Sequence, residues 1–187
     1  MCVNFAGSYE LSKFGKGCVK MFEVGERVVY GHHGVCEIVR IDTLDMPNVP
    51  KDRQYYYLAP TTDKTSIMYA PVDNPKLSIR RVMTKDDIMA LLREMPQIDL
   101  ITVANDRLRE NEYKDCIRSL DGKRWVSLLK TVRQRGKERI DRGKKMTALD
   151  ERYMKLVEMQ LYSEIAAVLD IPRNQVENYI AEHTVIA

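Results

Sequence analysis

The pattern of apolar and polar residues changes near residue 83, and the two sides of this point predict different structures. Between Phe22 and Val82, apolar residues form short runs rich in Val, Ile, Tyr and Thr, with Gly, Pro, Asp and Asn between them. Such runs are typical of β-strands, and five can be recognised: ERVVYG, GVCEIVRID, QYYYLAP, TSIMYAP and KLSIRRV. Five short strands in about sixty residues predict a small, strongly bent β-barrel.

Three connections between these strands carry clear turn signals. Asp63–Lys64 is typical of a tight hairpin turn, and Asp45–Asp52 of a longer, proline-containing loop. In YGHHG, between the first two strands, Gly31 and Gly34 supply unusual backbone angles for a tight reversal.

Beyond Met83, apolar residues recur with helical spacing. Thr84 precedes KDDIMALLREM, with acidic residues in the first turn where they suit the helix dipole, and Pro96 ends this helix. Asn105 is a possible cap for a second helix, which runs to about Leu120 and ends at Asp121–Gly122.

Three further helices follow. The third has one apolar stripe, at Trp125, Leu128, Leu129 and Val132. Thr147 and Asp150 form a capping-box-like start for the fourth, whose apolar positions are Met154, Val157, Leu161, Ile165 and Val168. Ile171–Pro172 marks a break before a last helix. The fold class is therefore α+β, a small Tudor- or SH3-like β-barrel over residues 21–83 followed by a helical bundle over residues 84–187.

The composition is that of an ordinary soluble protein. The chain has 187 residues, of which 44% are hydrophobic and 30% charged, and it contains no apolar run long enough to span a membrane. Its start has no apolar core of a secretory signal. Four cysteines without paired spacing indicate reduced thiols, so we expect a cytoplasmic protein.

The charges are segregated along the chain. Residues 105–145 carry fourteen basic and seven acidic side chains, whereas residues 146–187 carry three basic and seven acidic ones. The basic block is typical of a surface that binds a polyanion such as nucleic acid. Charge alone leaves a second interpretation open, in which the block is a solvated helix face.

His32, His33 and Cys36 are residue types that bind metals or catalyse reactions, and they lie close together. A metal site needs about four converging ligands, but the chain has only three histidines and no CxxC motif. Neighbours on a strand point to opposite faces, so we do not expect both histidines to share one ion. Cys36 fits a small buried residue, and no Gly-rich loop accompanies it. We therefore expect no metal, cofactor or catalytic site.

The stretch VGERVVYGHHGVCEIVRID resembles the opening of the CarD/CdnL family of bacterial transcription regulators, which typically reads GDxVVYPxHGVGxI. YYYLAP, APVDN, SIRRVM and MTALDERYMKLVEMQLYSEIA agree with later parts of that family, so the resemblance covers roughly residues 21–170. Members normally begin at the position of Met21. We expect residues 1–20 to be a disordered leader from an upstream start or an expression vector.

The resemblance implies a nucleoid-associated protein that is not an enzyme and acts as a monomer. Its barrel binds the RNA polymerase β subunit, and its helical domain contacts promoter DNA, stabilising the open complex, especially at ribosomal RNA promoters. The strand that the family uses for polymerase matches Thr65–Pro71, so the candidate residues are Thr65, Ile67, Tyr69 and Pro71. An exposed edge strand recruits a partner by backbone hydrogen bonds. Strand alternation places about half of the nearby aromatic and aliphatic residues inside the barrel instead.

The candidate DNA contacts lie in the basic helical half. They are Arg107, Arg109, Lys114, Lys123, Lys130, Arg133 and Lys137. Lys123, Lys130, Lys137 and Lys144 recur every seven residues and should share one helical face that follows phosphates with little sequence preference. Much of the family has a tryptophan four residues before a Tyr-Lys pair, where it enters the minor groove. Arg109 occupies that position here, and we expect Trp125 to be a core residue.

Two alternatives remain open. LYSEIAAVLDIPRNQVENYI, residues 161–180, is similar to a helix-turn-helix in which Arg173, Asn174 and Gln175 would read the major groove. The net negative charge of this region opposes that interpretation. The other alternative is an adaptor that binds polymerase and never contacts DNA.

Overall fold

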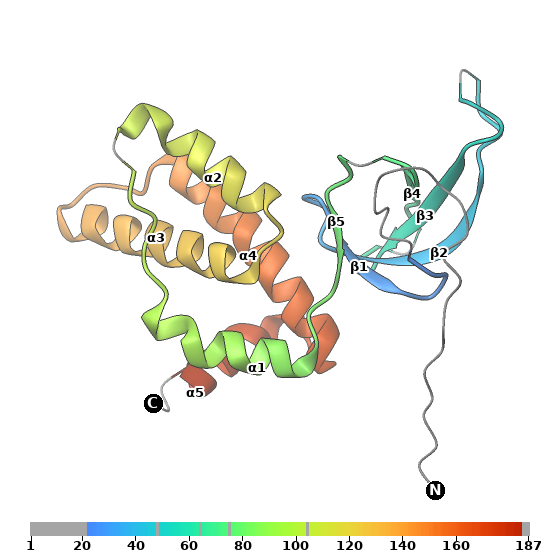
Figure 1. Ribbon diagram of the computed structural model, residues 1–187. Helices are drawn as coiled ribbons and strands as arrows, with labels where there is room; N and C mark the ends of the chain where they lie inside the picture. The colour runs from blue at the N-terminus through green and yellow to red at the C-terminus, as the bar shows by residue number, and fades with distance from the viewer. Residues whose placement is uncertain (1–21, 48, 64, 75, 104, 185–187) are drawn as a thin grey trace, which may run out of the picture.

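The computed structural model describes residues 22–184 except 48, 64, 75 and 104 (Figure 1). The expected leader, residues 1–20, lies outside the described residues. A five-stranded antiparallel sheet comes first in the chain, and helices follow it (Figure 1). The predicted α+β class and its order are therefore confirmed.

All five predicted strands form. They are β1 (Arg27–Tyr30), β2 (Val35–Thr43), β3 (Gln54–Pro60), β4 (Met68–Pro71) and β5 (Ile79–Arg81). Their order in the sheet is β4-β3-β2-β1-β5. Figure 1 shows the strands curling, but the ladder of the described residues is open, with β4 and β5 at its two edges. Closure into a Tudor-like barrel stays a prediction.

The inner face of the sheet carries its own apolar cluster. Phe22, Val28, Cys36, Ile38, Tyr56, Leu58 and Ala70 are buried together there. The register places Ile38 opposite Leu58, and Leu58 opposite Met68. Between Ile38 and Arg40 the register shifts, so Val39 forms a bulge. Such a bulge increases the local bend of a strand, which fits the curl of β2.

The two predicted tight turns differ in outcome. Gly31 and Gly34 have φ angles of +48° and +80° in the reversal between β1 and β2, as expected from YGHHG. The predicted two-residue turn at Asp63–Lys64 is wrong, because β3 ends at Pro60 and β4 begins at Met68. Lys64 itself lies outside the described residues. The Asp63 carboxylate accepts the Thr65 N–H at 3.0 Å and the Ser66 hydroxyl at 2.5 Å, which stabilises this longer loop.

The five predicted helices also form. They are α1 (Lys85–Glu94), α2 (Arg109–Arg118), α3 (Gly122–Asp141), α4 (Ala148–Leu169) and α5 (Val176–Thr184). Short 3₁₀ turns occupy Met95–Gln97, Asp106–Leu108 and Arg173–Gln175.

Side-chain caps begin three of these helices. Thr84 forms a capping box with Asp87, Asp121 caps α3, and the Thr147 hydroxyl accepts the Asp150 N–H at 3.1 Å. Asn105 was expected to cap α2, but its side chain accepts the Arg107 N–H in the preceding 3₁₀ turn. Leu108 is the N-cap residue of α2 and makes no side-chain hydrogen bond there.

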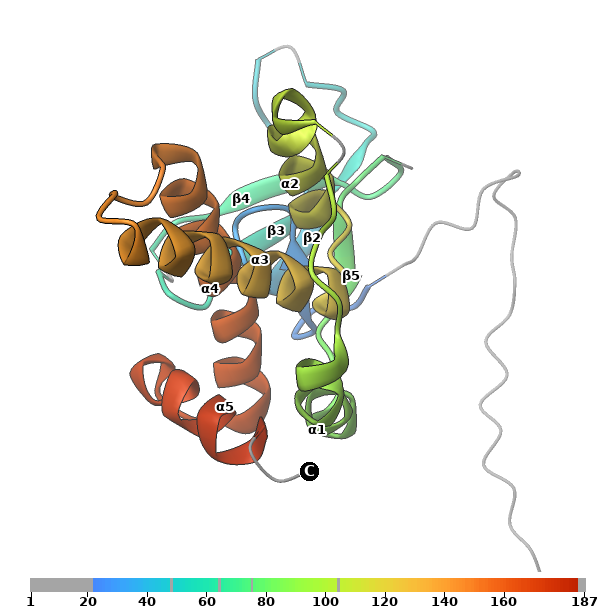
Figure 2. The same cartoon turned by 90° about the vertical axis from the view of Figure 1, so that its left-hand side faces the viewer.

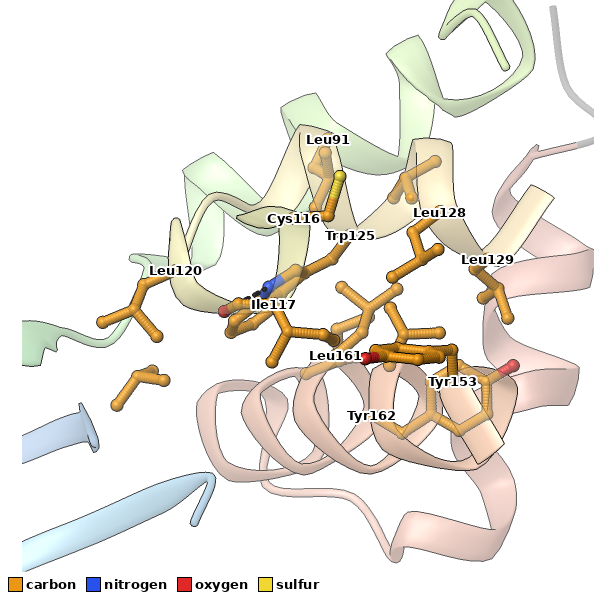
Figure 3. Packing of buried hydrophobic residues seen from close by; sticks show 14 of the residues in the cluster. Leu91, Cys116, Ile117, Leu120, Trp125, Leu128, Leu129, Tyr153, Leu161 and Tyr162 are labelled. Carbon is orange, nitrogen blue, oxygen red and sulfur yellow. Dashed lines mark hydrogen bonds between the residues drawn. The ribbon is translucent and has the colours of Figure 1, made fainter. Parts of the chain in front are cut away.

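The helices share a second apolar cluster, which also takes in Val29 and Val35 from the sheet. Figure 2 shows the helices in front of the sheet, with α1 and α5 together at one end. Trp125 is fully buried in this cluster (Figure 3), and its indole N–H lies 3.4 Å from the Ile117 carbonyl. Its predicted core position is confirmed. Within the described residues, no helix combines the length and apolar character needed to cross a membrane.

One ion pair joins the sheet to the helices. The guanidinium of Arg80 on β5 binds the fully buried carboxylate of Glu164 on α4, with 2.7 Å between Nη2 and Oε2. The same carboxylate accepts the Met83 N–H at 2.8 Å, and Arg80 also donates to the Leu120 carbonyl. At the other end of the junction, Arg27 donates to the Ala167 carbonyl at 3.0 Å. These contacts fix how the sheet lies against α4.

Candidate functional site

Strand β4 forms one edge of the sheet, as expected for the candidate binding strand. Val72 N–H donates to the Gln54 carbonyl at 3.0 Å, and hydrogen bonding alternates along an antiparallel pair. Ala70 and Met68 therefore face β3, while the backbone groups of Tyr69 and Pro71 point outward. Proline lacks a backbone N–H, and at an outward-pointing position this removes no hydrogen bond between the strands. The edge thus presents the Tyr69 N–H and two carbonyls to an incoming strand.

Exposed apolar side chains accompany this edge. Ile67 is 38% and Tyr69 44% exposed, although both are large and apolar. The Tyr69 ring packs edge-on against Tyr57 of β3, with ring centres 5.0 Å apart, and the Arg40 guanidinium lies 5.3 Å from the centre of the Tyr57 ring. Tyr56 and Leu58 of β3 point into the inner cluster, whereas Tyr55, two positions from Tyr57, lies on the opposite face and is nevertheless buried.

The other two candidates on this segment have different environments. Thr65 lies in the loop before β4, and its hydroxyl donates to the Asp63 carboxylate at 2.5 Å. Pro71 ends β4 and is half-buried.

Sequence reasoning missed Val39, which is 42% exposed. Together with Ile67 it lines a shallow hollow whose other residues are Glu37, Ala59 and Thr61. The bulge in β2 places both Val39 and Arg40 on the exposed side, so strict alternation along the sequence did not indicate it. We call Val39, Ile67 and Tyr69 the β4 patch.

The histidines lie in the β1–β2 turn and not on a strand, so the expected opposite orientation is wrong. Their ring centres are 4.1 Å apart, and His33 stacks on Tyr30 at 5.4 Å. Burial, and then the positive charge of His32, lower the pKa of His33. Cys36 is fully buried among apolar residues, as expected, and burial raises its pKa to about 11, which makes the thiol a poor nucleophile. The described residues contain no cluster of three His, Cys, Asp or Glu side chains suited to a metal.

Three candidate DNA contacts on α3 have partners on other elements of the protein. Lys123 on α3 lies 2.5 Å from the Glu94 carboxylate of α1. The Lys130 ammonium donates to the Met95 and Pro96 carbonyls at 3.1 and 3.0 Å and also to the Ile98 carbonyl. Lys130 thereby satisfies backbone acceptors at the end of α1, where a cation also suits the helix dipole.

Arg133 is the third of these residues. Its guanidinium donates to the Glu158 and Glu177 carboxylates at 2.9 and 2.6 Å and to the Tyr162 hydroxyl at 2.8 Å. These contacts join α3 to α4 and α5.

Lys144 does not share a helical face with the other lysines, because α3 ends at Asp141 and Gly143 turns the chain with a φ of +70°. Exposed basic residues at this end of α3 are Lys137, Arg142, Lys144 and Lys145. Ile140, 62% exposed, lies among them in the sequence.

The start of α2 carries the remaining candidates. Arg107 is exposed, and Lys114 pairs with Glu110 at 3.1 Å. Glu110 also binds Arg152 of α4 at 2.6 Å, so the start of α2 and the loop between α3 and α4 lie at the same end of the helices. Arg109 is half-buried and hydrogen-bonds the Tyr113 hydroxyl; the nearby positive charge opposes the rise that burial causes in the tyrosine pKa.

Comparison with protein families identifies the sheet. The family model described as CarD-like/TRCF RID domain matches residues 22–83. This part of the chain is therefore similar to CarD-like domains. A search of curated proteins finds no match.

The matched residues include all five strands, Arg80 of β5 and the β4 patch. This family is one of polymerase-interacting domains, and the match suggests a transcription-related protein.

The helix-turn-helix candidate lies outside the matched residues. Asp170 itself adopts the left-handed conformation, with φ of +55°, that a glycine would otherwise supply in this turn. Arg173, Asn174 and Gln175 are exposed in a 3₁₀ turn. The following α5 buries Val176 and places its Tyr179 hydroxyl 3.6 Å from the Met89 sulfur of α1. Helix α5 therefore closes the helical core on one side.

Proposed function

We propose that the protein regulates transcription by binding the RNA polymerase β subunit through β4 and promoter DNA through its basic helices. It thereby modulates the stability of the open complex, including that at ribosomal RNA promoters. The observation that carries the proposal is an exposed edge strand with an apolar patch within the residues that match the CarD-like family model.

The β4 edge has the properties of a strand-addition site. Unpaired backbone groups on an edge strand provide affinity for a partner strand, and alternate side chains provide specificity. Ile67 and Tyr69 are large enough to anchor a partner, and the contact with Tyr57 holds the Tyr69 ring before binding. A ring that is already ordered loses less conformational entropy on association.

The DNA contact rests on the cations that remain accessible. Lys123, Lys130 and Arg133 contribute mainly to helix packing, whereas Arg107 and Lys137 are exposed basic side chains without an ion-pair partner among the described residues. Contacts between such side chains and phosphates give salt-sensitive binding with little sequence preference.

The polymerase contact can be tested with the full chain, because Val29 and Val35 of the sheet pack into the helical core. Tyr69→Asp and Ile67→Asp should each weaken retention of purified polymerase, since each introduces a charge into an apolar contact. Val24→Asp is the matched control, because Val24 is 59% exposed but lies outside β4. Equal retention of all three variants and the parent would assign polymerase binding to another surface.

The DNA contact can be tested by fluorescence anisotropy with a random duplex over a series of salt concentrations. Arg107→Gln with Lys137→Gln should weaken binding and lower the slope of log K against log[salt] by about 0.9 for each lost phosphate contact. A parent that does not bind DNA would favour the adaptor alternative. A large, sequence-dependent loss in Arg173→Ala or Gln175→Ala would favour the helix-turn-helix.

A further inference from the structure

A cleft lies between the sheet and the helices, on the side of the β1–β2 turn. Its lining residues are Gly31, His32, Lys76, Ser78, Lys114, Ile117, Arg118, Tyr153 and Leu156. Four of these carry basic side chains and none is acidic. We call this site the junction cleft.

The basic groups of the junction cleft come from three separate segments. Lys114 and Arg118 lie one helical turn apart on α2, so both point to the same side about 6 Å apart along the axis. His32 lies in the β1–β2 turn, and Lys76 lies in the loop before β5, where the Asn74 side chain accepts its backbone N–H at 3.0 Å. Only the tertiary structure brings these charges together.

The cleft has a defined floor and two walls that are held against each other. Ile117 and Tyr153 are buried, and Leu156 is half-buried. The Ser78 hydroxyl donates to the Arg118 carbonyl at 3.5 Å, which holds the segment before β5 against the end of α2. The Arg80–Glu164 pair fixes the same part of the sheet against α4. The positions of the two basic walls are therefore set before any ligand arrives.

The charges of the cleft are not neutralised within the protein. In the part of the chain that the structure describes, Lys76 and Arg118 have no carboxylate partner, in contrast to Lys123 and Arg133. Lys114 does contact Glu110, but Glu110 is shared with Arg152 at 2.6 Å. Bringing such cations together is unfavourable without a counter-charge, so the cleft is suited to a polyanion.

We infer that the junction cleft binds the phosphate backbone of DNA, so that the sheet contacts DNA as well as polymerase. This inference rests on the proposed function and extends it, because Lys114 is both a wall of the cleft and a candidate DNA contact. Cations from α2 and from the loop before β5, with the His32 ring beside them, can bind successive phosphates, whereas a single small anion would need one converging cradle.

The test is anisotropy of the full-length protein with a labelled random duplex over a series of salt concentrations. Lys76→Gln with Arg118→Gln should weaken binding several-fold and lower the salt slope by about 0.9 for each lost phosphate contact. The matched control is Lys85→Gln with Arg93→Gln, which removes the same charges from exposed positions on α1 outside the cleft. Thermal melting of both variants verifies that they remain folded.

The outcomes separate this inference from the proposed function. An unchanged slope in the cleft variant, with a lowered slope in the Arg107→Gln/Lys137→Gln variant, overturns the inference and leaves the proposed function standing. Failure of the parent to bind DNA overturns both. Unchanged DNA affinity with weaker polymerase retention also overturns the inference, since the cleft would then bind an acidic protein surface. If the cleft variant and the α1 control lose the same DNA affinity, the effect is one of net charge alone, and the inference is overturned as well.

Discussion

The ion pair between Arg80 and Glu164 allows a quantitative test of how the sheet is joined to the helices. Its two ends differ in burial, because the Glu164 side chain is fully buried and that of Arg80 is 21% exposed. Glu164 also accepts the Met83 N–H, and the Arg80 guanidinium lies 5.3 Å from the centre of the Trp125 ring. The two single substitutions should therefore have unequal costs.

Arg80→Met leaves a buried carboxylate without its counter-charge. Breaking a buried pair in this way costs about 3–5 kcal/mol, and the partial exposure of Arg80 places the expected loss near 3 kcal/mol. Glu164→Gln keeps an acceptor for the Met83 N–H and leaves an arginine that reaches solvent, so we expect a loss of about 1–2 kcal/mol. The double variant buries no charge, and its loss should be at least about 1 kcal/mol less than the sum of the single losses.

Urea unfolding followed by far-ultraviolet circular dichroism and tryptophan fluorescence measures these free energies. The control is Arg81→Met, since Arg81 pairs with Glu26 at 2.9 Å but is 65% exposed; its effect should stay below about 1 kcal/mol. Additive losses would refute the pairing. A larger loss in Glu164→Gln than in Arg80→Met would refute the argument from unequal burial.

Further results are expected for three residues. Trp125→Ala should lower the free energy of unfolding by about 3–5 kcal/mol in urea titrations, because the indole fills the helical core; a variant as stable as the parent would contradict that packing. Lys130→Met should cost about 1–3 kcal/mol, because three carbonyls lose a charged donor, with little change in DNA affinity by anisotropy. Lost affinity at full stability would instead make Lys130 a DNA contact. Maleimide should label Cys36 only after unfolding, as peptide mass mapping can show, and stability should fall as pH rises from 9.0 toward about 11, because the folded state keeps this thiol protonated. Rapid labelling of the folded protein would contradict its burial.

The sequence alone determined the strands and helices of this protein, because their signals are local. Caps such as Thr84 and Thr147 act within three residues, and the glycines of YGHHG act through their own backbone angles. The Trp125 stripe predicted a buried face in the same way. Local signals were insufficient where two turn types compete, as in the loop around Asp63, and where a bulge interrupts alternation, as at Val39.

The tertiary structure decided which charged side chains are accessible. Seven-residue spacing placed Lys123, Lys130 and Lys137 on one face of α3 but gave no information about what packs against it. Lys130 finds its acceptors in residues 95–98, and Arg133 finds Glu177 from α5, both distant in sequence. Such partners depend on how helices pack, so charge counts along the chain overestimated the basic surface of α3.

The same reason explains the two surfaces proposed for binding. The sequence indicated that Thr65–Pro71 is a strand, but its position at an edge depends on the order β4-β3-β2-β1-β5. Lys76 and Arg118 both line the junction cleft, at the boundary between the sheet and the helices. The periodicity of residues within one strand or helix does not predict such a pairing between elements. Secondary structure follows from interactions between near neighbours, whereas a site between elements follows from long-range packing, which a single sequence does not display.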